Sequence, residues 1–253
     1  NYWLDKYNIN GSYKKISLSP ENFKLGIKRL MNDGYAGLNI TVPHKEMALE
    51  ISSNPTERAK KIGAANTLIF KKGKIYADNT DGIGFLNNLT QLAPGWKANL
   101  GPAVVLGAGG ASRSIVYSLL NEGAPKVILT NRTYERAKKL SNIFGEKVLV
   151  INWENINKHI SGINTLVNTT TLGMVGSSNL EIDLSTLSSN TLVTDIVYNP
   201  LKTPLLEDAN RIGCKTVDGL GMLLHQAVPG FKGWFGVEPK VDSALRDRVL
   251  LEL

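Results

Sequence analysis

Three short polar clusters in the first third of the chain carry side chains suited to binding and protonating a small substrate. Reduction of a ketone by hydride produces an alkoxide, which a positioned acid must protonate, and a lysine ammonium group can donate that proton while its charge stabilises the anion. Lys45 with Asp81 is a candidate pair for this chemistry. Spacing alone leaves open a surface lysine and a helix-capping aspartate. The clusters are Asn39-Ile40-Thr41-Val42-Pro43-His44-Lys45, Gly63-Ala64-Ala65-Asn66-Thr67 and Asp78-Asn79-Thr80-Asp81-Gly82.

A glycine-rich turn in the middle of the chain has the features of a dinucleotide-binding turn. It runs Gly107-Ala108-Gly109-Gly110-Ala111-Ser112 between an apolar run, Ala103 to Leu106, and an amphipathic helix that ends at Gly123. Gly107 permits a tight turn, and Gly109 lets a pyrophosphate approach the backbone at a helix N-terminus. A lone G-x-G match is weak, but the order strand, turn and helix makes a cofactor site the favoured interpretation over an empty turn.

The residues after the next expected strand indicate which dinucleotide is bound. NAD-binding proteins place an acidic residue there to hold the ribose 2′-hydroxyl. Here the strand leads to Asn131-Arg132-Thr133 and then to Arg136, and arginine suits planar recognition of a phosphate. We therefore expect NADP(H), the alternative being that both arginines are solvated charges at a helix start.

Alternation of helical and strand-like segments around this turn predicts a doubly wound parallel sheet. In the first third we expect a helix closed by Gly34, a strand over 37–41, and a hairpin of 65–70 with 74–77. A helix follows from Thr80 or Asp81, and two helices, about 220–228 and from about 239, end the chain. The expected strands of the parallel sheet are 103–106, 126–131, 148–152, 165–168, 192–195 and 215–218.

The composition of the 253 residues supports a globular chain, since 42% are hydrophobic and 20% charged. Cys214 is the single cysteine, and with three scattered histidines it cannot form a zinc cluster, so we expect no metal. No apolar run reaches a membrane-spanning length and no signal peptide is evident, so we expect a cytoplasmic protein. The net charge of +7 is dispersed, which favours anionic small molecules over nucleic acid.

The order of the motifs along nearly the whole chain resembles the shikimate dehydrogenase family of the aromatic amino-acid pathway. The matching motifs are N-I-T-V-P-H-K at 39–45, G-A-A-N-T at 63–67, D-N-T-D-G at 78–82, G-A-G-G-A at 107–111, N-R-T-Y-E-R at 131–136, N-T-T-T-L-G-M at 168–174, D-I-V-Y-N-P at 195–200 and D-G-L-G-M-L-L-H-Q at 218–226. The resemblance implies reversible NADPH-dependent reduction of 3-dehydroshikimate to shikimate, an oxidoreductase reaction in chorismate biosynthesis.

The resemblance also implies roles for individual residues. Lys45 resembles the catalytic acid/base and Asp81 its partner, both touching the substrate. Further substrate-binding positions are Thr41, Asn66, Tyr198 and Gln226. Cofactor-binding positions are Glu57, Gly107, Ala108, Gly109, Gly110, Ala111, Asn131, Arg132, Thr133, Tyr134, Glu135, Arg136, Ile196 and Gly219. For Gln226 and the residues around Asn168, core packing and strand-end hydrogen bonding are equally good interpretations.

The fold class that follows is α/β with two domains. Residues 1–83, completed by helices in 220–253, would form an α/β substrate domain, and residues 84–219 a Rossmann-type cofactor domain. The family opens with a strand carrying a Ser-x-Ser motif that grips the substrate carboxylate; this motif does not precede Asn1, and we expect the natural protein to have it.

Two other functions remain open for this chain: a quinate/shikimate dehydrogenase using NAD, and a dinucleotide-sensing protein without turnover. Nucleic-acid binding rests on charge alone. The expected assembly is a monomer or homodimer.

Overall fold

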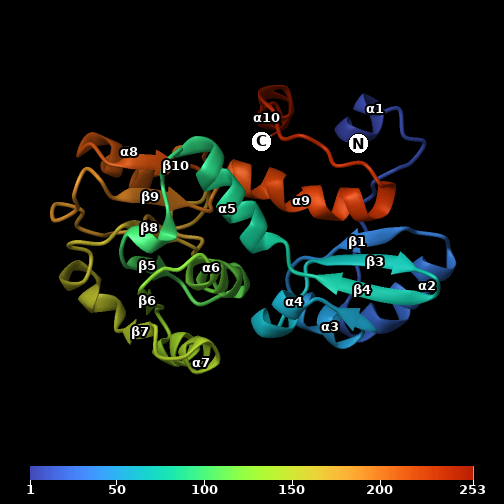
Figure 1. The fold of residues 1–253 in the computed structure, drawn as a ribbon, viewed down its shortest axis with the longest axis horizontal. Coiled ribbons are helices and arrows are strands. Elements are labelled where there is room, and N and C mark those ends of the chain that lie inside the picture. The colour runs from blue at the N-terminus through green and yellow to red at the C-terminus, as the bar shows by residue number, and fades with distance from the viewer. Residues whose placement is uncertain (253) are drawn as a thin grey trace. The chain divides into compact units, whose positions relative to one another are not determined.

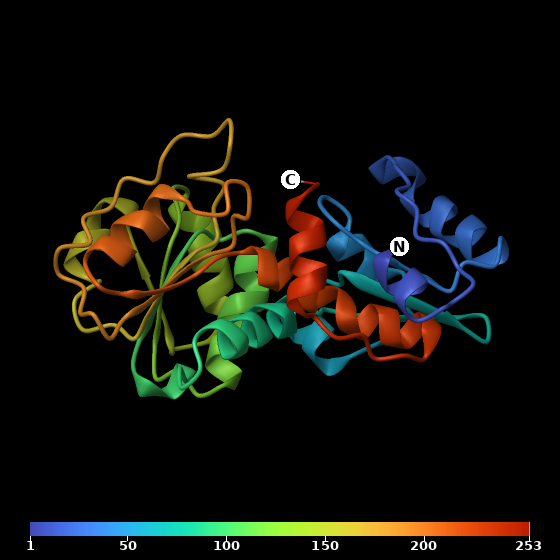
Figure 2. The same cartoon turned by 90° about the horizontal axis from the view of Figure 1, so that it is seen from above.

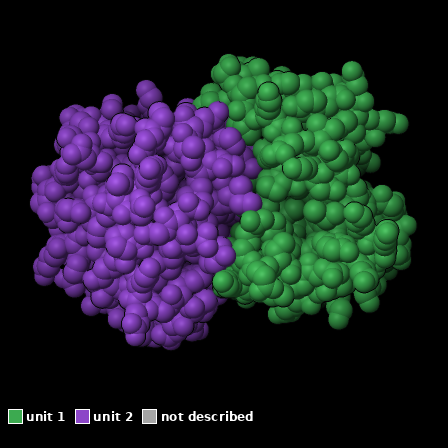
Figure 3. Space-filling model, in the orientation of Figure 1, with its two compact units in different colours: residues 1–80, 226–253 green, residues 81–225 purple. Residues whose placement is uncertain are grey.

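The computed structural model describes residues 1–252, and the chain divides into two compact units. One unit comprises residues 1–80 and 226–253 and the other residues 81–225 (Figure 3). Each unit is built around its own sheet. No helix within 1–252 has the length and apolar character required to cross a membrane.

The unit of residues 81–225 is built on a six-stranded sheet in which every pair of neighbours is parallel (Figure 1). The strand order is β10-β9-β8-β5-β6-β7. Starting from β5, the chain adds β6 and β7 on one side and then returns to add β8, β9 and β10 on the other. This is the doubly wound order, and the strand order reverses between β5 and β8. The strands are β5 (Ala103–Leu106), β6 (Val127–Thr130), β7 (Val148–Ile151), β8 (Thr165–Asn168), β9 (Leu192–Asp195) and β10 (Lys215–Val217).

Continuous apolar strands form here because both faces of the sheet are covered, as Figure 2 shows from above. Ala103 and Val105 of β5 pack in one core cluster with residues of α5, α6 and α7, while Val104 and Leu106 pack in a second cluster with residues of α8. The helices are α5 (Asp81–Leu92), α6 (Gly110–Asn121), α7 (Tyr134–Phe144) and α8 (Pro204–Arg211), with 3-10 turns η2 (Ala98–Leu100) and η3 (Trp153–Lys158).

The other unit contains a four-stranded sheet of order β1-β3-β4-β2. β3 pairs antiparallel with both β1 and β4, and β2 runs parallel to β4. Its strands are β1 (Gly37–Asn39), β2 (Asn54–Pro55), β3 (Thr67–Lys71) and β4 (Lys74–Asp78). Its helices are α1 (Tyr2–Lys6), α2 (Phe23–Asn32), α3 (Lys45–Glu50), α4 (Glu57–Ile62) and α10 (Ser243–Leu250), with the turn η1 (Pro20–Asn22).

The core of this unit lies between the sheet and the early helices, where Phe23 and Ile27 of α2 pack with Leu68 of β3. From the C-terminal part of α9 (Leu220–Phe235), Trp234 also reaches β3, since its Nε1–H donates to the Leu68 carbonyl at 2.8 Å.

The prediction that this helix ends near residue 228 is wrong, because α9 continues through Pro229 to Phe235. Proline removes one backbone donor and disfavours a helix interior. Aromatic contacts follow the proline, including Phe231 against Trp3 with ring centroids 5.3 Å apart, and they favour continuation of the helix.

Candidate active site

Backbone hydrogen bonds within the unit of residues 1–80 join the three polar clusters of the first third of the chain. The backbone N–H of Ile40 donates to the Asn66 carbonyl at 2.7 Å, and that of Ala65 donates to the Lys45 carbonyl at 2.8 Å. The Asn66 N–H donates to the Asp78 carbonyl at 3.0 Å. The loop after β1, the residue that begins α3 and the end of β4 are therefore joined through the segment just before β3.

The buried side chain of Asn66 organises this junction. Its Oδ1 accepts from the Thr80 backbone N–H at 2.8 Å and from the Thr67 hydroxyl at 3.0 Å. Its Nδ2 donates to Gln226 Oε1 at 2.9 Å, and the Thr80 hydroxyl donates to the Gln226 carbonyl at 2.8 Å. The structure thus brings together two predicted substrate-binding residues, Asn66 and Gln226. It also fixes Thr80, after which Asp81 follows directly as the first residue of α5.

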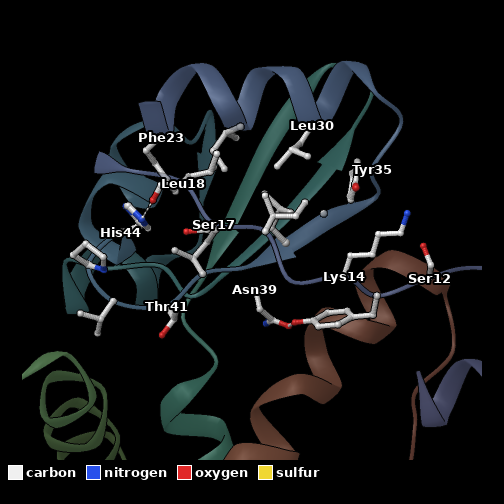
Figure 4. A pocket seen from close by; sticks show the side chains of 18 residues that line it. Ser12, Lys14, Ser17, Leu18, Phe23, Leu30, Tyr35, Asn39, Thr41 and His44 are labelled. Atoms are coloured by element: carbon white, nitrogen blue, oxygen red, sulfur yellow. Dashed lines mark hydrogen bonds between the residues drawn. The ribbon is translucent and has the colours of Figure 1, made fainter. Parts of the chain in front are cut away.

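Lys45 and Thr41 lie in the turn that leads into α3. The His44 backbone N–H donates to the Thr41 carbonyl at 3.0 Å, and Lys45 begins the helix. The Lys45 side chain is half-buried and Thr41 is exposed. Thr41 also lines a cavity of about 320 Å³ bordered by β1 and residues 12–18, shown in Figure 4.

Two buried polar atoms on residues lining this cavity have no hydrogen-bond partner among residues 1–252. His44 Nε2 donates to the Leu18 carbonyl at 2.9 Å, and its Nδ1 is unpaired. Asn39 Oδ1 accepts from the Tyr13 hydroxyl at 2.8 Å, while its Nδ2 donor is unpaired. Buried polar atoms are normally paired, so these two are exceptions in the part of the chain that the structure describes.

An ion pair between Arg58 and Asp78 stabilises the loop before Asp81, and the sequence motifs do not predict it. Arg58 of α4 donates from Nε at 2.7 Å and from Nη2 at 2.5 Å to the two carboxylate oxygens of Asp78. The Thr56 hydroxyl donates to the same carboxylate at 2.7 Å, and so does the Asn79 backbone N–H at 2.8 Å. β2, which precedes α4, pairs with β4, which ends at Asp78, so the contact depends on the tertiary fold and no motif in the sequence indicates it.

In the unit of residues 81–225, the glycine turn lies at the carboxyl end of β5, beside the point where the strand order reverses. Gly107 has φ +107°, and a Cβ there would lie 2.7 Å from Thr169 Oγ1, so glycine is required for the fold itself. At Gly109 and Gly110 a Cβ would meet no atom within 4 Å. These two glycines leave open space at the N-terminus of α6, where backbone N–H groups lack helical acceptors. The turn therefore fits a dinucleotide pyrophosphate.

The residues predicted to bind the adenosine 2′-phosphate follow β6 and lie next to the glycine turn. Asn131 follows β6, and its Oδ1 accepts from the Ala108 backbone N–H at 3.1 Å. Its Nδ2 donates to the Thr133 carbonyl at 2.9 Å, which shapes the start of α7. Arg132 and Arg136 are exposed, and among the described residues neither forms an ion pair. Both guanidinium groups are available to an anion. Thr133, Tyr134 and Glu135 are also exposed, and Tyr134 begins α7.

Two predicted contacts near the nicotinamide, Ile196 and Gly219, touch each other. A Cβ at Gly219 would lie 2.3 Å from the Ile196 carbonyl oxygen and 2.6 Å from that of Val197, so the loops after β9 and β10 pack backbone to backbone. Tyr198 lies two residues further along and is partly exposed.

Glu57 is the one predicted cofactor residue that lies in the other unit, at the start of α4. It pairs with Lys60 at 2.6 Å, and this hydrogen bond lowers the pKa of its carboxyl group. Across residues 1–252, no three His, Cys, Asp or Glu side chains gather where they could hold a metal ion.

Comparison with known proteins identifies the family of this chain. Residues 1–68 match the shikimate dehydrogenase substrate binding domain, and residues 95–220 match the shikimate / quinate 5-dehydrogenase model. The chain is 50% identical over 250 residues to the shikimate dehydrogenase (NADP(+)) of Ruegeria sp. (strain TM1040), covering 98% of this chain and 91% of that protein.

Solved structures show the same relationship. The shikimate 5-dehydrogenase of Thermus thermophilus, in complex with NADP(H) and shikimate, is 32% identical with a TM-score of 0.83, covering 94% of this chain and 87% of that one. The quinate dehydrogenase of Corynebacterium glutamicum, in complex with NAD, is 31% identical with a TM-score of 0.85, covering 94% and 86%. The prediction from the motifs is therefore confirmed at the level of family and fold, and the chain belongs to the shikimate dehydrogenase family.

Proposed function

We propose that this protein catalyses the reversible, NADPH-dependent reduction of 3-dehydroshikimate to shikimate. The observation that carries the proposal is the junction centred on Asn66, which joins the turn bearing Lys45 to the loop that ends at Thr80. A buried carboxamide network beside a half-buried lysine suits a polyhydroxylated substrate, because hydroxyl groups need donors and acceptors in fixed positions. The relative from Ruegeria, named for this activity with NADP(+), supports the same assignment.

In the proposed mechanism Lys45 is the acid in the direction of reduction. NADPH, when bound, supplies the hydride that adds to the carbonyl carbon. The Lys45 ammonium group donates a proton to the carbonyl oxygen, so that the new hydroxyl forms without a free alkoxide. In oxidation the neutral amine accepts that proton. We assign Asp81 to a substrate hydroxyl and to the orientation of Lys45, and Thr41, Asn66, Tyr198 and Gln226 to the remaining polar groups.

We propose that residues 1–83 with 220–253 serve substrate binding and that residues 84–219 serve the cofactor. Residues 107–111 would hold the pyrophosphate, residues 131–136 the adenosine 2′-phosphate, and Ile196 with Gly219 the nicotinamide side. Glu57 is assigned to the cofactor side on family resemblance alone.

The exposed, unpaired Arg132 and Arg136 support NADP(H) over NAD(H), because a 2′-phosphate adds a doubly charged group that guanidinium binds well. The similarity to a quinate dehydrogenase in complex with NAD makes quinate oxidation with NAD the second candidate. Both reactions use dissolved small molecules, so we propose a cytoplasmic enzyme, monomeric or homodimeric, without a nucleic-acid or membrane partner.

The experiment that separates these candidates follows the absorbance of reduced nicotinamide in four mixtures, shikimate or quinate with NADP⁺ or NAD⁺. We expect the highest kcat/KM with shikimate and NADP⁺. A preference for quinate with NAD⁺ would favour the second candidate. NADP⁺ binding measured by calorimetry, without turnover of either acid, would indicate a sensing protein and contradict the proposal.

A further inference from the structure

A carboxylate that no candidate role uses lies fully buried at the end of β9. Asp195 is 0% exposed. Its Oδ1 accepts from Asn168 Nδ2 at 3.0 Å and from the Val197 backbone N–H at 2.9 Å. Its Oδ2 accepts from the Thr203 hydroxyl at 2.8 Å. Burial raises the pKa of this carboxyl group, while the three hydrogen bonds act in the opposite direction.

Through Asn168, this carboxylate reaches the loop after β8. The same Asn168 Nδ2 also donates to the Leu172 carbonyl at 3.1 Å. Asn168 Oδ1 accepts from the Thr170 backbone N–H at 3.0 Å and from the Thr170 hydroxyl at 2.7 Å. Thr170 Oγ1 in turn accepts from the Leu172 backbone N–H at 3.1 Å. The loop of residues 168–172 is therefore held in one conformation by a side chain that Asp195 orients.

That loop packs directly against the glycine turn. The Thr169 hydroxyl donates to the Leu106 carbonyl at 2.6 Å, and Thr169 Oγ1 lies only 2.7 Å from the position that a Cβ on Gly107 would take. Asp195 also fixes the start of the loop after β9, which carries Ile196 and Tyr198, because it accepts from the Val197 backbone N–H. The Ile196 N–H donates to the Asn168 carbonyl at 3.1 Å, so both loops share the same support.

We propose that Asp195 is a positioning residue for the cofactor: its buried carboxylate holds the loops after β8 and β9 in the arrangement that supports the glycine turn and Ile196. It touches neither substrate nor cofactor, because it has no exposed surface. A carboxylate suits this position, because two oxygens with several lone pairs accept three donors from three segments. The inference rests on the proposed function only in naming the ligand as NADP(H).

The test compares Asp195→Ala with Asp195→Asn. Asparagine retains Oδ1 for Asn168 and Val197, and its Nδ2 can donate to the Thr203 hydroxyl. We expect Asp195→Ala to weaken NADP⁺ binding about tenfold or more by calorimetry and Asp195→Asn to restore most of it. We also expect hydrogen exchange at the Thr170 and Leu172 amides to accelerate about tenfold in Asp195→Ala, with or without cofactor.

Two milder variants cover the case in which Asp195→Ala does not fold. Thr203→Val removes the buried hydrogen bond to Asp195, and it also removes the side-chain cap that the Thr203 hydroxyl oxygen provides for the Leu206 backbone N–H at the start of α8. Thr191→Val removes a different buried hydrogen bond, from the Thr191 hydroxyl to the Ile163 carbonyl at 3.0 Å, at the opposite end of β9. We expect both variants to lose thermal stability, but weaker NADP⁺ binding and faster Thr170 exchange only in Thr203→Val.

Equal effects of Thr203→Val and Thr191→Val on Thr170 exchange would overturn the inference, as would Asp195→Ala exchange rates unchanged from the native protein. If the native protein does not bind NADP⁺ at all, the proposed function fails. The exchange rates still decide whether Asp195 holds the loops.

Discussion

Gly109→Ala separates the effect of this glycine on folding stability from its effect on cofactor binding. Gly109 has φ −93° and ψ −168°, which alanine adopts freely, and its added Cβ would meet no atom within 4 Å. Such a replacement reduces the freedom of the unfolded chain and stabilises a protein by about 0.4–1 kcal/mol. A methyl group in a contact that glycine leaves for a pyrophosphate costs about 1–3 kcal/mol. At about 1.4 kcal/mol per factor of ten, we expect NADP⁺ to bind roughly 5- to 150-fold more weakly.

Thermal unfolding and calorimetric titration with NADP⁺ measure the two effects on the same sample. Gly107→Ala is the matched control, because its Cβ would lie 2.7 Å from Thr169 Oγ1 at a positive φ and should lower stability. A Gly109→Ala protein of unchanged stability that binds NADP⁺ as tightly as the native protein would refute the assignment of this turn to the pyrophosphate.

Three further predictions concern the 2′-phosphate, the Arg58–Asp78 ion pair and the pH dependence of stability. Arg132→Ala should weaken NADPH much more than NADH in parallel titrations, and an equal loss would show that this guanidinium does not read the 2′-phosphate. Arg58→Met should lower the free energy of unfolding by about 1 kcal/mol in a denaturant titration, since it removes two hydrogen bonds to the mostly buried Asp78. The control Arg211→Met breaks an exposed ion pair and should change the free energy of unfolding little. Burial lowers the pKa of His225 in the folded protein. As the pH falls below about 6.5, His225 therefore binds a proton more readily in the unfolded chain than in the folded one, and the free energy of unfolding decreases. His225→Gln should flatten the fall in melting temperature between pH 7.5 and 5.5, and an identical pH profile would contradict this.

The parallel sheet could be predicted from the sequence because its physical signal is local. A strand covered on both faces is mostly apolar, and β5, β8 and β9 begin and end at the predicted bounds 103–106, 165–168 and 192–195. The end of α9 could not be predicted in this way. Proline at 229 predicts a stop, whereas the helix continues to Phe235 and Phe231 packs on Trp3, a residue far away in the sequence.

The members of the site could be predicted from motifs, but their connections could not. Asn66 and Gln226 are 160 positions apart, so their hydrogen bond depends on the tertiary fold. The same holds for Arg58 with Asp78, and for Asp195 with Asn168. Each of these polar side chains is common in loops and at strand ends, and its type alone does not indicate a partner.

Lys45→Met separates proton transfer from cofactor binding. The substitution keeps an apolar stem of similar length and removes the ammonium group that donates the proton. With shikimate and NADP⁺, we predict that reduced nicotinamide forms at least about 100-fold more slowly than in the native protein, while calorimetry gives the same NADP⁺ affinity. Turnover at the native rate would show that another group moves the proton and would contradict the mechanism.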